Sequence, residues 1–112
     1  MTVDPHRPDL SPPVRIAQTD GRQAVLAFSG HLDAGALRLL EELLLDHRLR
    51  QPGTWILEMS DLEHIDLACA YALLRTVTRA PEPAAVTVRG ARPAVHRTLR
   101  HAGLDTVAAF EG

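Results

Sequence analysis

The first part of the chain shows two short apolar runs with a turn between them. Apolar residues gather at 14–16 and again at 24–28, and Thr19-Asp20-Gly21-Arg22 separates the two runs. Asp-Gly between apolar runs is a strong hairpin signal, because glycine readily adopts the positive φ that a tight hairpin turn needs. We therefore predict two antiparallel strands at the start of the domain.

Helical spacing begins after this pair of strands. Leu37, Leu40 and Leu44 recur at i, i+3 and i+7, which places them on one face of a helix. Asp33 precedes them and can accept hydrogen bonds from the first free amides. The pattern predicts a helix that runs to about Arg50, just before a Pro-Gly pair that stops it.

Two further helices are expected, ending at Arg79 and before Gly103. Asp66 can cap the first of them, which has an apolar stripe along one side. Pro93 suits the first turn of the second, and Gly103 is a natural left-handed terminator.

Three further short apolar runs predict strands. They cover residues 54–59, 85–88 and 107–110, and we expect a loop over 61–65. The predicted order is strand, strand, helix, strand, helix, strand, helix, strand. This order predicts an α/β domain with a mixed sheet of four to five strands and about three helices.

Length and composition indicate one ordinary globular domain. The chain has 112 residues, of which 46% are hydrophobic and 23% charged. Residues 1–13 contain four prolines and few apolar side chains, so we expect a flexible lead there. The predicted domain is therefore 14–112.

Charge and cysteine usage narrow the classes of function. The net charge is −2, and all 12 basic residues are arginines, so no excess positive field draws the chain to nucleic acid or to an anionic membrane. No apolar run approaches the roughly 20 residues that a membrane helix needs, and the N-terminal region does not resemble a secretory signal. The lone Cys69 cannot form an internal disulfide. We expect a cytoplasmic protein without membrane insertion.

Candidate catalytic and metal-binding residues are sparse. Cys69 near a helix start could be a nucleophile with His64 as its base, but no third member or substrate pocket is evident. A small half-buried side chain is the favoured interpretation. His96 and His101 are five residues apart, about 140° around a helix, which argues against a shared metal ion. We predict no catalytic residue, metal or cofactor.

Four arginines surround the third predicted helix. Arg89, Arg92, Arg97 and Arg100 could meet a phosphate, a nucleotide or an acidic partner. A solvated helix face is the alternative, and we favour it.

Several motifs in order resemble the anti-sigma factor antagonist (STAS) family over about residues 14–110. Gly30-His31-Leu32-Asp33 opens the first helix, and a strand ending in Glu58-Met59-Ser60 leads through Ile65-Asp66 into the second. Gly103-Leu104-Asp105 follows the third. Members of the family typically have Gly-Glu-Leu-Asp at the first of these places. At the second they have a strand ending in Asp-Leu-Ser, followed by Ile-Asp-Ser-Ser-Gly-Leu.

The chain departs from the family at the phosphorylated serine. In members that act as phospho-switches, a partner kinase modifies the second serine of Asp-Ser-Ser-Gly, and here the segment is Asp66-Leu67-Ala68-Cys69. Ala68 has no hydroxyl group. We expect no phosphorylation at this position and hence no switch of that kind.

The resemblance implies a non-catalytic regulatory module of bacterial signalling and transcription control. Its partner would be an anti-sigma factor or a related kinase-type regulator, or another STAS protein. The implied partner-binding residues are Gly30, His31, Leu32, Asp33, Asp66, Leu67, Ala68, Cys69 and Tyr71. The family's last helix has no counterpart in this sequence, which suggests a homodimer or partner contact there. A ligand-sensing or assembly subunit of a transporter or signalling complex is the alternative.

Overall fold

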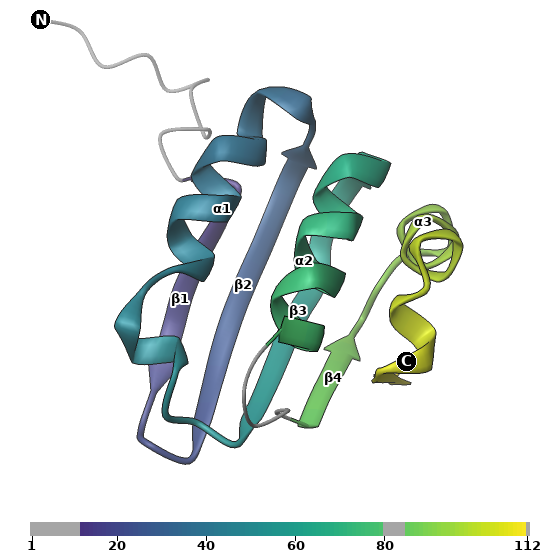
Figure 1. Cartoon of the computed structure of the whole chain (residues 1–112). Coiled ribbons are helices and arrows are strands. Elements are labelled where there is room, and N and C mark those ends of the chain that lie inside the picture. The colour runs from purple at the N-terminus through teal and green to yellow at the C-terminus, as the bar shows by residue number, and fades with distance from the viewer. Residues whose placement is uncertain (1–11, 80–84, 112) are drawn as a thin grey trace, which may run out of the picture.

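The computed structural model describes residues 12–79 and 85–111 and confirms the predicted order of elements (Figure 1). The strands and helices are β1 (Val14–Thr19), β2 (Gln23–Leu32), α1 (Leu37–Leu44), β3 (Thr54–Ile65), α2 (Leu67–Arg79), β4 (Ala85–Arg89), α3 (Pro93–Ala102) and β5 (Ala108–Glu111). Three short 3₁₀ turns accompany them: η2 (Ala34–Ala36), η3 (His47–Leu49) and η4 (Leu104–Thr106).

The five strands form one mixed sheet in the order β1-β2-β3-β4-β5. β1 pairs antiparallel with β2, and every later pair is parallel. The Asp20 carboxylate accepts hydrogen bonds from the amides of Arg22 and Gln23, and Gly21 has φ +84°. The predicted hairpin is therefore confirmed, and its turn uses the glycine in the left-handed region.

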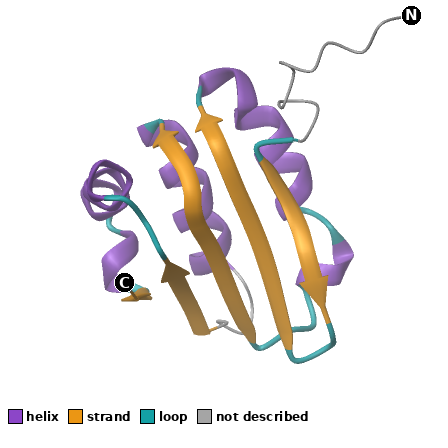
Figure 2. Cartoon of the chain, turned by 180° about the vertical axis from the view of Figure 1, so that it is seen from behind, coloured by secondary structure: helices purple, strands orange, loops and turns teal. Residues whose placement is uncertain are grey.

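All three helices cover the same face of the sheet (Figures 1 and 2). Each helix connects two adjacent parallel strands, and such crossovers are almost always right-handed. Successive crossovers in one direction along the sheet therefore deliver their helices to one side. Figure 2 shows the opposite face, which no helix of the described residues covers.

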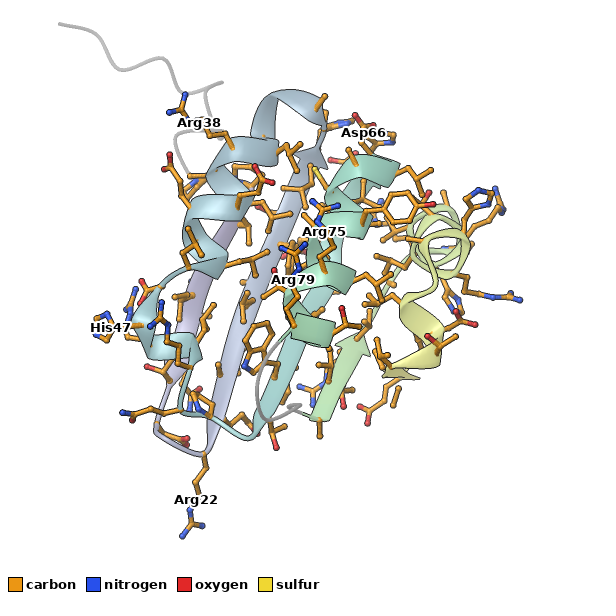
Figure 3. The ribbon with its side chains drawn as sticks, in the orientation of Figure 1. Arg22, Arg38, His47, Asp66, Arg75 and Arg79 are labelled. Carbon is orange, nitrogen blue, oxygen red and sulfur yellow. The ribbon has the colours of Figure 1, made fainter. Side chains whose placement is uncertain are left out.

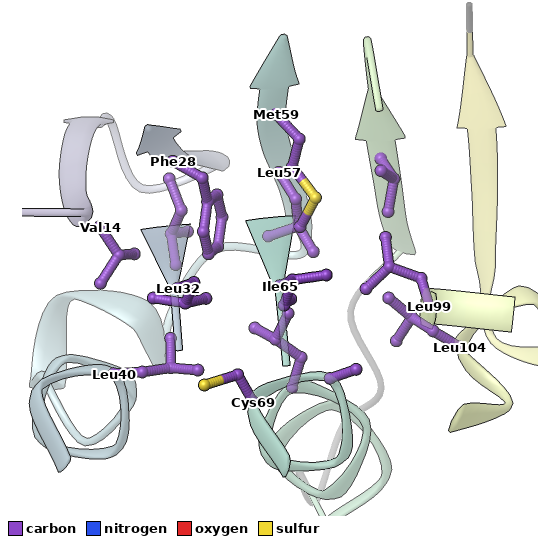
Figure 4. Close-up of a cluster of buried hydrophobic side chains, with 14 of the residues drawn as sticks. Val14, Phe28, Leu32, Leu40, Leu57, Met59, Ile65, Cys69, Leu99 and Leu104 are labelled. Carbon is purple, nitrogen blue, oxygen red and sulfur yellow. The ribbon is translucent and has the colours of Figure 1, made fainter. Parts of the chain in front are cut away.

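The core lies between the sheet and these helices (Figure 4). Strand residues that alternate towards the helices meet apolar residues of α1, α2 and α3. The largest fully buried side chains include Leu26, Phe28, Leu32, Leu40, Leu57, Met59, Leu62, Leu73, Leu99 and Leu104. Gly103 ends α3 with φ +96°, as predicted, and directs Leu104 into this core.

The expected first helix is wrong at its C-terminal end. α1 stops at Leu44, six residues before Arg50. Asp46 then accepts a hydrogen bond from the Arg48 amide and caps the separate turn η3, in which Leu49 is buried. The chain therefore leaves the α-helix at a local aspartate cap, several residues before Pro52.

The expected loop over 61–65 is also wrong, because those residues continue β3. They pair in parallel with an extension of β2 that reaches Leu32. β3 contains extra residues relative to β2 at two register shifts, so its buried residues Met59, Leu62 and Ile65 are spaced by three. Bulges of this kind remove the alternation by which a strand is recognised in sequence.

The predicted flexible lead, residues 1–13, lies almost entirely outside the described residues. Within the described part, the Pro13 carbonyl accepts a hydrogen bond from the Ser29 amide at 2.9 Å. No helix among the described residues is long and apolar enough to cross a membrane.

Candidate functional site

The two segments predicted to bind a partner meet at one edge of the sheet. β2 and β3 are parallel, so their carboxyl ends lie side by side, and η2 and α2 both start there (Figure 1). Gly30, His31 and Leu32 are the last residues of β2 rather than a loop, and Asp33 follows them. The Asp66 amide donates to the Leu32 carbonyl at 2.9 Å, which joins the two segments directly.

The side chain of Asp66 joins the two segments at this edge (Figure 3). One carboxylate oxygen accepts from the Ala34 amide at 2.8 Å, and the other lies 2.6 Å from Nε2 of His64. The hydrogen bond from His64 is the main reason why the pKa of Asp66 is lowered. Neither oxygen bonds to an amide of α2, so the predicted side-chain cap is wrong. Asp66 instead bridges two segments that are 32 residues apart.

Cys69 is a buried residue of α2 at the same edge. Its side chain is fully buried and lies between α1 and α2 beside Leu40 (Figure 4). The thiol donates to the Asp33 carbonyl at 3.4 Å. Burial, together with nearby carboxylates, raises the pKa of the thiol to about 11. The expected half-buried position is wrong, and a buried neutral thiol has no thiolate with which to attack a substrate.

The outer side of α2 presents apolar side chains to solvent. Leu67 is 36% exposed and Tyr71, one turn later, is 39% exposed. Ala68 lies between them and is also exposed, as are His31 and Asp33 on the neighbouring segment. The ring centres of His31 and His64 are 6.0 Å apart. The first turn of α2 therefore buries Cys69 and exposes a small uncharged apolar surface.

Two shallow hollows lie beside this surface, along α3. One, of about 350 Å³, is lined by His64, Ile65, Asp66, Leu67, Arg97, Thr98 and His101. The other, of about 340 Å³, is lined by Arg97, Arg100, His101 and Asp105. His96 does not line either hollow and stacks on Phe110 at 4.5 Å between ring centres. The described residues place no three His, Cys, Asp or Glu side chains together as a metal site.

The role of His64 was missed by reasoning from sequence. His64 was considered only as a base for Cys69, but its ring bonds to Asp66. Alternate residues of a strand share a face, so the His-Ile-Asp spacing is the signal that could have indicated this contact. The expected loop over 61–65 does not predict this shared face, whereas the observed strand does.

Solved structures of known proteins resemble this fold. An anti-sigma factor antagonist from Mycobacterium paratuberculosis superposes with a TM-score of 0.70 at 21% identity, covering 88% of this chain and 83% of that chain. RsbS of Moorella thermoacetica, in a variant with glutamate in place of a serine, gives 0.63 at 28% identity, with 87% and 84% covered. The murine anion transporter Slc26a9 gives 0.61 at 17% identity, with 80% of this chain but 15% of that chain covered.

Sequence comparison assigns the family. Comparison with curated proteins finds no matching sequence. Residues 16–109 match the family described as "Mlab, STAS domain", which spans the whole sheet except the first residues of β1 and the last of β5. The chain belongs to the STAS domain family.

Proposed function

We propose that this protein is a non-catalytic regulatory module that binds an anti-sigma factor, or a related kinase-type regulator, in the bacterial cytoplasm. Its binding surface would comprise Gly30–Asp33 and Asp66–Tyr71. The observation that supports this most directly is the edge where these segments meet: Asp66 and Cys69 tie it together from within, while Leu67 and Tyr71 remain exposed.

A braced edge suits binding without a large rearrangement. Three contacts connect the segments: the Asp66 carboxylate to the Ala34 amide, the Asp66 amide to Leu32, and the Cys69 thiol to Asp33. A surface that is already ordered loses less conformational entropy when a partner docks. This favours a binding module over an enzyme, which would need a reactive group at the same place.

Ala68 makes the binding independent of phosphorylation at this position. The residue is exposed beside Leu67 at the start of α2, where a phosphate would add nearly two negative charges. Alanine offers no acceptor, so the surface stays uncharged. We propose that binding is therefore constitutive and that its control comes from expression level or from a competing partner.

Calorimetric titration against the purified anti-sigma kinases of the native host tests the proposal. We expect binding to at least one of them, and the same affinity after incubation with kinase and ATP. Ala68→Glu should weaken binding by roughly tenfold or more, since a charge enters an apolar contact. Ala17→Glu, at an exposed position on β1, is the matched control and should leave affinity unchanged. Absence of binding to every such kinase would contradict the proposal.

A second candidate is an assembly subunit of a transport complex. It is favoured by one observation, the resemblance to part of the murine anion transporter Slc26a9. In this case the same edge would dock permanently on a transporter component. Stable copurification with a transport ATPase or permease from the native host, with no kinase bound, would favour this candidate over the first.

A further inference from the structure

Two arginines and a histidine lie along α3 beside the proposed binding edge. Arg97, Arg100 and His101 are all exposed. Over residues 92–105 there are three arginines and one aspartate, a net charge of +2, whereas the whole chain has a net charge of −2. Positive charge is therefore concentrated on this helix and its flanks.

Arg97 and Arg100 share with Arg15, Arg22, Arg50, Arg79 and Arg92 the absence of a carboxylate partner among the described residues. Arg38, Arg48, Arg75 and Arg89 each form an ion pair with a glutamate or aspartate. Among the described residues, Arg97 and Arg100 form none, although Asp105 lines the same hollow. Their guanidinium groups are thus available to a carboxylate from another molecule.

The cationic and apolar features form one continuous surface. Arg97 and His101, one helical turn apart, line both hollows, and the larger hollow reaches Leu67 at the start of α2. We call this the α2–α3 surface, and define it by Leu67, Tyr71, Arg97, Arg100 and His101. Its hollows are shallow and open, which suits a protein segment better than an enclosed small molecule.

We propose that the α2–α3 surface binds an acidic, partly apolar segment of a partner protein. The inference rests on the proposed function, because it extends the binding edge on to α3 and specifies the chemistry of the partner. Leucine or similar side chains of the segment would pack on Leu67 and Tyr71. Its glutamate or aspartate side chains would pair with Arg97 and Arg100, for which guanidinium geometry is well matched.

The direct test is a titration of the isotope-labelled protein by two-dimensional NMR. The probe is a synthetic peptide composed of leucine and glutamate, and the matched control peptide has lysine at every glutamate. We expect amide shifts at Leu67, Tyr71, Arg97 and His101 with the acidic peptide only, diminishing as salt increases. The double variant Arg97→Glu, Arg100→Glu should bind the acidic peptide more weakly and raise its dissociation constant by roughly fivefold or more.

Arg22→Glu is the control for charge reversal, since Arg22 lies at the opposite edge of the sheet from Asp66 (Figure 3). It should leave peptide binding unchanged. We expect both variants to remain folded, because the substituted arginines are exposed and no described residue forms an ion pair with them. The spectra of the variants check this directly.

The outcomes separate this inference from the proposed function. Equal shifts with the lysine peptide, equal shifts with inorganic phosphate alone, or no shift at these residues would overturn the inference, even if a kinase binds elsewhere. Concentration-dependent shifts at the same residues without peptide would assign the surface to a second copy of the chain and also overturn it. Acidic-peptide binding without binding to any kinase would sustain the inference and contradict the proposed function.

Discussion

The two faces of the sheet differ in what packs against them. On the face under the helices, Leu26, Leu57 and Val88 lie in one apolar core with helix residues. On the other face no helix of the described residues is present (Figure 2). Ile56 and Glu58 are not part of the core cluster, because they alternate with Trp55 and Leu57 along β3. Neighbouring residues of one strand therefore meet very different surroundings.

On the open face, side chains of neighbouring strands shield one another from solvent. Ile56 is flanked in register by Val25 on β2 and Thr87 on β4, and it is only 8% exposed. A row of charges adjoins it: Arg89 lies 3.9 Å from Glu58 and 3.7 Å from Glu111. Exposed ion pairs at such distances contribute little stability. We therefore expect the helix-covered face to supply most of the folding free energy.

Truncating adjacent residues on the two faces should produce the largest difference. Leu57→Ala removes a fully buried side chain from the core and should cost about 3 kcal/mol of unfolding free energy. Ile56→Ala, on the open face, should cost about 1–2 kcal/mol, because solvent can fill the space that it leaves. Urea unfolding of both variants measures this. Equal losses would contradict the assignment of stability to the covered face.

A glycine beside the open face should show how tightly its strands are packed. Gly90 has φ +72°, and a Cβ there would lie 2.9 Å from Cβ of Ser60 on β3. Gly90→Ala should therefore cost about 2–3 kcal/mol, from backbone strain and a close contact together. Gly21→Ala, at φ +84° with nothing within 4 Å, isolates the strain and should cost about 1 kcal/mol. If Gly90→Ala and Gly21→Ala lose the same free energy of unfolding, measured by heat or urea, the contact with Ser60 contributes nothing.

Acid should weaken the contacts that Asp66 makes at the edge where β2 and β3 end. The pKa of Asp66 is lowered from 3.8 because His64 and the Ala34 amide stabilise its charged form. A lowered folded-state pKa contributes stability at higher pH, which is lost as the pH falls below about 3.8. Asp20 and Asp46 also have lowered pKa values, so the whole chain should lose stability there.

The measurement is the melting temperature across the acid range. Asp66→Asn should lower the melting temperature at neutral pH and show a smaller further decrease on acidification than the unsubstituted protein. A curve for Asp66→Asn parallel to that of the unsubstituted protein would show that the Asp66 charge contributes nothing.

The smallest effect is expected in the charged row of the open face. Arg89→Ala removes both ion pairs, yet should cost at most about 0.5–1 kcal/mol, since the groups are about half exposed and remain solvated. Raising the salt concentration should reduce the difference further. A loss comparable to that of Leu57→Ala would mean that the two faces contribute equally to stability.

Elements governed by local chemistry were predictable from the chain alone. The Asp20-Gly21 turn, the cap at Asp33, Pro93 at the start of α3 and the left-handed Gly103 all lie where the sequence predicts them. Each depends on the residue's own backbone preference or on partners within a few positions. These signals, with the alternation of strand and helix patterns, were enough for the α/β class and the order of elements.

The edge at which β2 and β3 end depends on contacts that no local pattern contains. The bulged continuation of β3 exists because β2 extends beside it, and the Asp66 carboxylate finds its amide partner 32 residues away. Cys69 is buried because α1 packs against α2. Local residue patterns along the chain were sufficient to predict which elements form and in what order. Which side chains meet depends instead on strand register and on helix packing between residues far apart in the chain, and these pairings leave no local pattern.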